Sequence, residues 1–403
     1  MPQISIKGQQ VPASPIRKLT PYADAAKKRG VKVYHLNIGQ PDLPTPQKAL
    51  DALKTIDRKT LEYSPSQGLL SLREKLVGYY KRVGIDLTTD EMIVTTGGSE
   101  ALLFAFMACL NPGDEIIMTE PTYANYLSFA KLAGVTVRTV TSKIETGFAL
   151  PSIEEYEAVI TPSTKAILLS NPNNPTGYVY THEELMRLRD IVLKYDLFLI
   201  SDEVYREFVY YKEPFLSAMC LPDLEQNVVL VDSMSKRYSE CGIRVGLVAS
   251  HNKELMAAIL KFAQARLSPP LLGQIVAEAS IDGTEDYAKA CYDEYKARRD
   301  FFIKGLNSIP GVMTPNPHGA FYTVVSLPVD NAEDFCRWIL SDFVWKDGTY
   351  PEGETVMMAP AAGFYSSPSH GKNQVRMAYV LKIDDLKRAL LVLEKALEAY
   401  RSR

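Results

Sequence analysis

A lysine stands at an unusual place in the segment DSMSKRYSECGIRVG, residues 232–246. Lys236 follows NVVLVDS (227–233), an apolar run typical of a buried strand. Lysine is rarely buried without a partner, so Lys236 either marks the exposed end of the strand or supplies an amine for chemistry. Apolar or cationic neighbours would lower the pKa of that amine and make it nucleophilic. Nearby side chains suited to binding a phosphate are Ser233, Ser235 and Arg244.

A carboxylate and a phenol end another apolar run, LFLISDEVY (197–205). Asp202 could hold a proton on a ring nitrogen of a ligand, and Tyr205 could reach the same ligand. Asp202 could instead cap the turn that follows the strand. A third polar group, Asn174, lies in the proline-rich turn SNPNNPTGYVY (170–180), where an asparagine often bonds only its own backbone.

Two glycines separate a strand from a helix in TTGGSEALLF, residues 95–104. The amides of Gly98, Ser99 and Glu100 would then face outward at a helix N-terminus, which is a ready site for a phosphate. Two glycines before a helix are also a common tight turn, so this motif alone does not decide between the two interpretations.

These residues need elements that bring them together. Short apolar runs alternate with helical patterns, and seven of them read as strands: 91–96, 114–120, 135–140, 165–170, 197–205, 227–233 and 244–250. This alternation predicts an α/β fold with a mainly parallel seven-stranded sheet between helices. Ligands of such sheets collect outside the carboxyl ends of the strands, where the polar residues above lie.

The end of the chain follows another pattern. Helical patterns, a hairpin-like segment and a strand are expected at 285–307, 311–327, 331–342, 374–380 and from Asp384 onward. They predict a smaller α+β domain. The N-terminal arm is interrupted by prolines at positions 12, 15, 21, 41, 44 and 46, so it cannot be one regular element and is expected to lie across a surface. We expect a large domain over 46–290 and a small domain made of 1–45 and 291–403.

Composition excludes several other classes of protein. The net charge is −3, which gives no field that favours nucleic acid or an anionic membrane. Five widely spaced cysteines without a CxxC pair argue against a disulfide framework, and five histidines without HxxxH spacing predict no metal site. The chain shows neither a signal peptide nor an apolar run long enough to span a bilayer. A soluble cytoplasmic protein is expected.

Three motifs in this order carry a resemblance. SNPNNPTG, then DEVY, then SMSKRYSECGIRVG resemble the fold type I, class I/II aminotransferases that depend on pyridoxal 5′-phosphate. The similarity extends from NIGQPDLPTP to NQVRMAYV, nearly the whole chain. SKRYSECGIRVG is most similar to enzymes described as aspartate or broad amino-acid aminotransferases.

The resemblance implies a role for each catalytic group. Lys236 would form a Schiff base with the cofactor aldehyde and then move the Cα proton to C4′. Asp202 would keep the pyridine nitrogen protonated, so that the ring can accept electrons. Asn174 and Tyr205 would bond the 3′-oxygen. Tyr123 in EPTYANY would lie over the ring face, although it could equally be a core tyrosine.

The resemblance also implies how the cofactor and substrate are held. Arg376 would clamp the substrate carboxylate by a bidentate pair, beside Asn174 and the backbone of Gly39. Tyr63 in YSPSQGLL would reach the phosphate of the neighbouring subunit, so a homodimer with shared active sites is implied. The phosphate would be bound by Gly98, Ser99, Glu100, Ser233, Ser235 and Arg244.

The implied reaction is ping-pong amino transfer, with L-aspartate and 2-oxoglutarate as the leading pair. A dicarboxylic substrate needs a cation for its distal carboxylate. Some bacterial aspartate aminotransferases place a lysine where this chain has Ser99; Arg266 in FAQARLSPP could substitute, or could be a helix-end cation. Aromatic amino acids and alanine are alternatives, as are a C–S lyase on this scaffold and a regulator that senses the cofactor. Such regulators carry a DNA-binding segment, which is not visible here.

Overall fold

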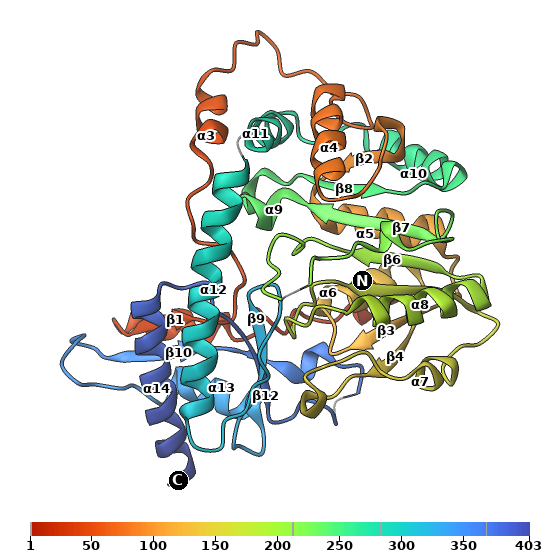
Figure 1. Cartoon of the computed structure of the whole chain (residues 1–403). Coiled ribbons are helices and arrows are strands. Elements are labelled where there is room, and N and C mark those ends of the chain that lie inside the picture. The colour runs from red at the N-terminus through yellow and green to blue at the C-terminus, as the bar shows by residue number, and fades with distance from the viewer. Residues whose placement is uncertain (1, 212, 283, 368) are drawn as a thin grey trace.

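The larger part of the molecule is built on one twisted sheet (Figure 1). The computed structural model describes residues 2–211, 213–282, 284–367 and 369–403. In spatial order the strands are β2 (Met92–Thr95), β8 (Gly246–Ala249), β7 (Val228–Ser233), β6 (Phe198–Asp202), β5 (Thr164–Ser170), β3 (Glu115–Glu120) and β4 (Thr136–Thr141). β8 runs antiparallel to both neighbours and the other pairs are parallel. The predicted mainly parallel seven-stranded sheet is confirmed.

Helices cover both faces of this sheet because successive strand residues point to opposite sides. Ile116 and Met118 of β3 pack into one core, whereas Ile117 between them packs into the other. The first core is shared with α5 (Gly97–Cys109), α6 (Ala124–Ala133) and α10 (Lys253–Arg266). The second is shared with α4 (Leu70–Arg82), α7 (Ile153–Glu157), α8 (His182–Tyr195) and α11 (Leu271–Ile281). Apolar strands are therefore required through the middle of the sheet, whereas in the edge strand β4 the one buried residue is Val140.

The helix predicted to begin at Thr181 shows how local sequence sets an element boundary. Thr181 caps α8: its hydroxyl accepts from the Glu184 amide at 3.2 Å, and the Glu184 carboxylate accepts from the Thr181 amide at 2.8 Å. This reciprocal box satisfies two amides that the first turn leaves without helical partners. α8 starts one residue later, at His182.

The smaller part joins segments from near both ends of the chain in one core, from Leu19 onward on the N-terminal side (Figure 1). Its strands are β1 (Lys32–His35), paired with β10 (Glu354–Met357), and β11 (Ala359–Pro360), β12 (Gln374–Ala378) and β9 (Tyr322–Ser326) in a separate sheet. They pack with α2 (Thr20–Lys28), α12 (Thr284–Ser308), α13 (Ala332–Ser341) and α14 (Ile383–Arg401). The division at residues 46 and 290 stays a prediction.

The local structure differs from two of the expectations for this part of the chain. The hairpin expected over 311–327 is a single strand, β9, whose ladder partner is β12. Met313 makes only an isolated bridge with Ser326, because Pro315 and Pro317 have no amide to extend a ladder. The N-terminal arm is not one element, as predicted, but it does contain α1 (Ile6–Gln10), α2 and β1. Pro21 is tolerated in the first turn of α2, where amides lack helical partners.

The remaining elements are short. They are α3 (Gln47–Lys54), α9 (Met234–Arg237) and the 3₁₀ helices η1 (Thr89–Glu91), η2 (Ile144–Thr146), η3 (Ala218–Cys220), η4 (Cys241–Ile243) and η5 (Ala361–Phe364). Among the described residues, none of the helices combines the length and apolar character that crossing a bilayer would require.

Candidate active site

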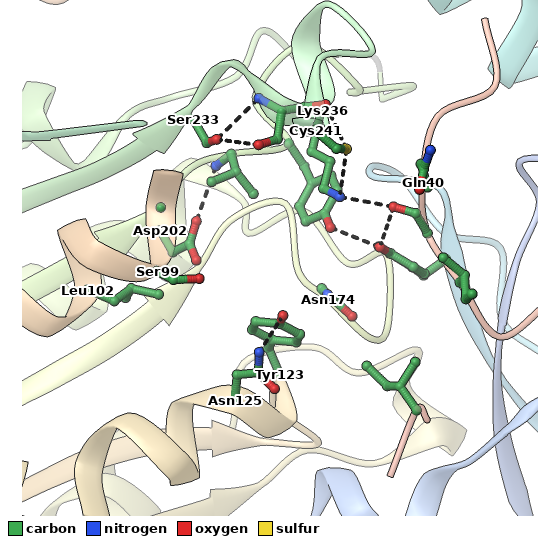
Figure 2. Close-up of a pocket in the computed structure, with 18 of the residues that line it drawn as sticks. Gln40, Ser99, Leu102, Tyr123, Asn125, Asn174, Asp202, Ser233, Lys236 and Cys241 are labelled. Atoms are coloured by element: carbon green, nitrogen blue, oxygen red, sulfur yellow. Dashed lines mark hydrogen bonds between the residues drawn. The ribbon is translucent and has the colours of Figure 1, made fainter. Parts of the chain in front are cut away.

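A cavity of about 610 Å³ lies at the carboxyl ends of the central strands, with walls from both parts of the chain. Lys236, Asp202 and Asn174 come from different segments and line the same space (Figure 2). Most residues singled out from the sequence line it: Gly39, Gly98, Ser99, Tyr123, Asn174, Asp202, Tyr205, Ser233, Ser235, Lys236, Arg244 and Arg376. The structure thus brings together residues that are up to 337 positions apart, from Gly39 to Arg376.

Lys236 sits on α9, a single turn that follows β7 directly. Ser233 caps this turn, its hydroxyl accepting from the Ser235 amide at 3.1 Å. The Lys236 amine donates to the carbonyl of Gly39 at 3.0 Å and lies 3.7 Å from the Cys241 sulfur (Figure 2). The amine is therefore held in the cavity by weak, exchangeable contacts, which leaves it available to a ligand.

One end of the cavity has the donor set of a phosphate site. α5 begins at Gly97 (φ 74°), where a Cβ would lie 2.4 Å from Nη2 of Arg244. Glycine thus lets the guanidinium approach the first turn of the helix. The hydroxyls of Ser233 and Ser235, 2.8 Å apart, also line this region. A helix N-terminus, two hydroxyls and a guanidinium together suit a phosphate dianion.

Asp202 ends β6 as a buried carboxylate. It accepts from the Tyr126 hydroxyl at 2.6 Å and from the Val204 amide at 3.3 Å. No cationic side chain of the described residues pairs with it, and burial raises its pKa to about 6. A protonated ring nitrogen would supply the missing charge, so this carboxylate fits the role predicted for it.

Two tyrosines connect the two parts of the chain across the cavity. The Tyr205 and Tyr322 hydroxyls are 2.9 Å apart, and the Tyr322 hydroxyl donates to the Gly39 carbonyl at 3.3 Å. A Cβ at position 39 would lie 1.7 Å from that hydroxyl, so only glycine fits there. The same carbonyl accepts from Lys236, so Gly39 contacts both groups through one oxygen.

Arg376 enters the cavity from β12, with its side chain almost fully buried. Nη1 donates to the Asn174 side chain at 3.1 Å and Nη2 to the Asn37 carbonyl at 2.5 Å. The guanidinium lies between the rings of Tyr322 and Phe364, 4.6 and 5.1 Å from their centroids. Its buried Nε finds no hydrogen-bond partner among the described residues. Each Nη nitrogen carries a second N–H beyond the one that these bonds use, so Arg376 can still donate to a carboxylate.

Three other candidates lie elsewhere. The Glu100 side chain turns away from the cavity, accepting from the Thr96 amide and from Arg266 Nη1, each at 2.7 Å. Arg266 also donates to the Ser66 and Val94 carbonyls and does not line the cavity, so it acts as a helix-end cation. Tyr63 is 76% exposed on this chain and also lies outside the cavity lining. The predicted roles of the Glu100 amide and of Tyr63 stay predictions.

Tyr123 lines the cavity beside Asn125, whose side-chain amide donates to its hydroxyl at 2.8 Å (Figure 2). Its ring forms a T-shaped pair with that of Tyr126, with the ring centroids 5.3 Å apart. Burial raises the pKa of this phenol to about 12.

Sequence reasoning did not find several lining residues: Ser14, Arg17, Gln40, Tyr126, Cys241 and Tyr322. Tyr126 and Cys241 stand inside motifs that were already singled out, and closer reading of those motifs could have found them. Nothing local marks Arg17 or Tyr322, because their place depends on how the N-terminal arm and β9 fold back over the sheet.

Comparison with known proteins identifies related chains. The family model described as "Aminotransferase class I and II" matches residues 31–361. An aspartate aminotransferase of Thermotoga maritima is 31% identical, covering 98% of this chain and 100% of its own. A mutant of the Thermus thermophilus aspartate aminotransferase superimposes with a TM-score of 0.88 at 28% identity, and an alanine aminotransferase of Pyrococcus furiosus with 0.88 at 31%. Each covers 98% of this chain and 100% of its own length.

Proposed function

This chain belongs to the class I and II aminotransferases, which depend on pyridoxal phosphate, and we propose that it transfers the amino group of L-aspartate to 2-oxoglutarate. The names of the Thermotoga and Thermus relatives support this pair of substrates. The structural observation that best supports this substrate pair is the positive charge of the cavity. Four cationic side chains line it, Arg17, Lys236, Arg244 and Arg376, whereas Asp202 is the one carboxylate among its described lining residues. Such a surplus suits an anionic cofactor together with a dicarboxylic substrate.

The residues at the sheet end would hold the cofactor. When bound, pyridoxal phosphate supplies an aldehyde that captures amino groups and a ring that accepts electrons released at Cα. Arg244, Ser233 and Ser235 would bind the phosphate together with the first turn of α5. Asp202 would hold a proton on the ring nitrogen. Tyr205 and Asn174 would bond the 3′-oxygen, and Tyr123 would pack against the ring.

Arg376 and Lys236 act on the substrate. Arg376 binds the α-carboxylate through its guanidinium and so fixes the orientation of the amino acid. The Lys236 amine, which donates to the Gly39 carbonyl in this structure, would leave that contact and move the proton of the substrate Cα. Asn174 keeps Arg376 in place through the 3.1 Å hydrogen bond.

A donor screen tests the substrate pair. Purified protein loaded with cofactor is mixed with 2-oxoglutarate and one amino acid, and glutamate formation is followed. We expect aspartate to react faster than phenylalanine or alanine, with stoichiometric 2-oxo acid and with pyridoxamine phosphate accumulating when the acceptor is omitted. Equal rates for the three donors would contradict the choice of aspartate. A C–S lyase would release its product without accumulating pyridoxamine phosphate.

The role of Lys236 has a separate test. Borohydride treatment of the loaded protein should fix the cofactor to the peptide that contains Lys236, as measured by mass spectrometry. Lys236→Ala should abolish both the fixed cofactor and amino transfer, whereas Lys253→Ala on the surface of α10 should retain both. Cofactor fixed to another lysine in the Lys236→Ala protein would show that the assignment is wrong.

We also propose a homodimer with shared sites. The segment that follows α3 lies beside the start of α11, since the Ser66 hydroxyl donates to the Leu267 carbonyl at 2.7 Å. Large apolar side chains are exposed on these two segments: Leu61, Tyr63, Leu70, Leu267 and Leu272. Such a patch favours contact with another chain. Co-expression of Lys236→Ala and Tyr63→Ala chains tests the sharing, because a hybrid dimer holds one site with both residues intact. Recovered activity supports the proposal. Hybrids without recovery would place Tyr63 outside the partner's site.

A further inference from the structure

Arg17 is the one cation of the cavity for which the proposed function has no role yet. The other three make hydrogen bonds within the protein: Lys236 to Gly39, Arg244 to the Cys241 carbonyl at 3.0 Å, and Arg376 to Asn174 and Asn37. Within the part of the chain that the structure describes, the Arg17 guanidinium has neither a hydrogen bond nor an ion pair. An arginine that faces a binding cavity without a counter-ion is available to an anionic group of a ligand.

The backbone around Arg17 is held firmly although its side chain is exposed. The Arg17 amide donates to the Ser14 carbonyl at 3.2 Å, and the Thr20 amide to the Arg17 carbonyl at 2.9 Å. Next to it, Lys18 pairs with Glu333 at 2.5 Å, and Leu19 is buried in the core of the smaller part. A fixed backbone means that Arg17 does not have to order a loop in order to bind, which reduces the entropic cost.

A single buried residue connects Arg17 to the proposed carboxylate clamp. The Asn37 side chain donates to the Ile16 carbonyl at 3.2 Å, while the Asn37 carbonyl accepts from Arg376 Nη2 at 2.5 Å. Asn37 therefore contacts both the Arg376 guanidinium and the backbone that precedes Arg17. Both charges also act on the phenol of Tyr123, where they oppose the rise in pKa that burial causes. Arg17 and Arg376 thus face one region of the cavity.

We infer that Arg17 binds the second carboxylate of a dicarboxylic substrate, while Arg376 binds the first. The inference rests on the proposed function, since it names the side chain that would select aspartate, glutamate and 2-oxoglutarate over monocarboxylic substrates. It also explains how this chain can lack a cation at Ser99. Arg266 does not supply it, because its guanidinium is engaged by Glu100 and two carbonyls outside the cavity. A guanidinium can bind a carboxylate by two parallel hydrogen bonds, which makes it a selective partner.

The test uses the full-length protein loaded with cofactor, in three variants. Arg17→Met removes the charge and keeps most of the length, Arg17→Lys keeps the charge, and Lys18→Met is the control beside it, since Lys18 does not line the cavity. The half-reaction with L-aspartate or L-alanine is followed by single-turnover absorbance, so that no dicarboxylic acceptor is present. Binding of succinate and butyrate, which cannot react, is measured by calorimetry.

We expect Arg17→Met to lower the ratio of kcat/KM for aspartate to that for alanine about 10- to 100-fold, the range for a hydrogen bond to a charged group. Succinate should bind more weakly by a similar factor, while butyrate, with one carboxylate, keeps most of its affinity. Arg17→Lys should recover part of both losses, and Lys18→Met should match the wild type.

The outcomes separate this inference from the function on which it rests. A wild-type enzyme that does not prefer aspartate to alanine contradicts the proposed substrate and, with it, the role of Arg17. A wild type that prefers aspartate, with an Arg17→Met variant that keeps both this preference and its affinity for succinate, contradicts the role of Arg17 alone. Equal losses for aspartate and alanine would also overturn it, since they would indicate a general structural effect.

Discussion

Two buried aspartates lie near the carboxyl ends of neighbouring parallel strands, and they differ in their partners. Asp232 in β7 pairs with Arg237 Nη2 at 2.5 Å and Arg206 Nη1 at 3.5 Å, and accepts from the Tyr80 hydroxyl at 2.6 Å. Asp202 in β6 accepts from a tyrosine at the same distance, but the described residues offer it no cation. One carboxylate is neutralised by the protein and the other is not.

The pKa values follow from this difference. Although burial would raise it, the charges of Arg237 and Arg206 hold the pKa of Asp232 below its ordinary value. Burial raises that of Asp202 to about 6, with only neutral donors to oppose it. A buried carboxylate without a counter-ion is unfavourable unless a ligand brings the charge. Asp202 therefore marks a ligand site, whereas Asp232 belongs to the internal support of α9 and Lys236.

The largest effect is expected for Asp232→Asn. The substitution leaves Arg206 and Arg237 buried beside a neutral amide, which should lower the free energy of unfolding by about 3–5 kcal/mol. Urea unfolding of the cofactor-free protein measures it. Asp223→Asn, which removes a surface partner of Arg189, is the control and should change little. A loss at Asp232 no greater than at Asp223 would contradict the view that this cluster is structural.

Asp202→Asn should act in the opposite way. Stability of the cofactor-free protein should hold or rise, because a neutral amide avoids the buried charge. The kcat/KM for amino transfer should fall about 100- to 1,000-fold, about 3–4 kcal/mol, since the ring nitrogen loses its anionic partner. Asp232→Asn protein that has folded and bound cofactor should keep far more activity. Similar losses of activity in both variants would remove the distinction.

The pH dependence of stability should also separate the two residues. In the folded cofactor-free protein, Asp202 keeps its proton up to about pH 6. In the unfolded chain, the same carboxyl group loses its proton near pH 3.8. Between these values the folded state binds more protons, so the contribution of Asp202 to stability is present at low pH and is lost as pH rises through 6, by about 2–3 kcal/mol. Asp232, with a lowered pKa, has the opposite sign.

Unfolding by urea from about pH 4 to 7 measures this dependence. The difference in unfolding free energy, wild type minus Asp202→Asn, should decrease as pH rises. A difference that stays constant across this range would show that Asp202 does not titrate there. Holoenzyme should lose this dependence, because the cofactor supplies a positive charge that keeps the carboxylate ionised.

The contrast between the aspartates also shows what the sequence can predict. Alternating apolar runs place Asp202, Ser233 and Lys236 at one edge of a parallel sheet, and a motif resemblance adds Arg376, so most of the candidate site was found. The sequence does not predict which side chains pair with each carboxylate. Arg206 stands four residues after Asp202, yet it pairs with Glu203 and Asp232 instead. Which strand-end carboxylate lacks a cation depends on side-chain directions that no linear spacing gives.

The same limit applies to long-range contacts. Tyr322 lies 283 residues from the Gly39 carbonyl that it contacts, and Asn37 joins Ile16 to Arg376 across the whole chain. These contacts exist because the two chain ends share one core. The hairpin expected at 311–327 failed for a related reason: β9 finds its partner in β12, far along the chain.

Removing one hydrogen bond from each aspartate is the mildest test of the comparison. Tyr126→Phe deletes the donor that favours the charged form of Asp202, so the pKa of Asp202 should rise further. The affinity of the cofactor-free protein for pyridoxal phosphate, titrated from about pH 5 to 8, should then weaken about fivefold near pH 6, the equivalent of one hydrogen bond of about 1 kcal/mol. Tyr80→Phe should lower the free energy of unfolding by about 1 kcal/mol as well. It should leave the pH dependence of cofactor affinity unchanged, because Arg206 and Arg237 keep Asp232 ionised. A shifted profile in Tyr80→Phe, or an unshifted one in Tyr126→Phe, would mean that the counter-ion does not set the difference between the two carboxylates.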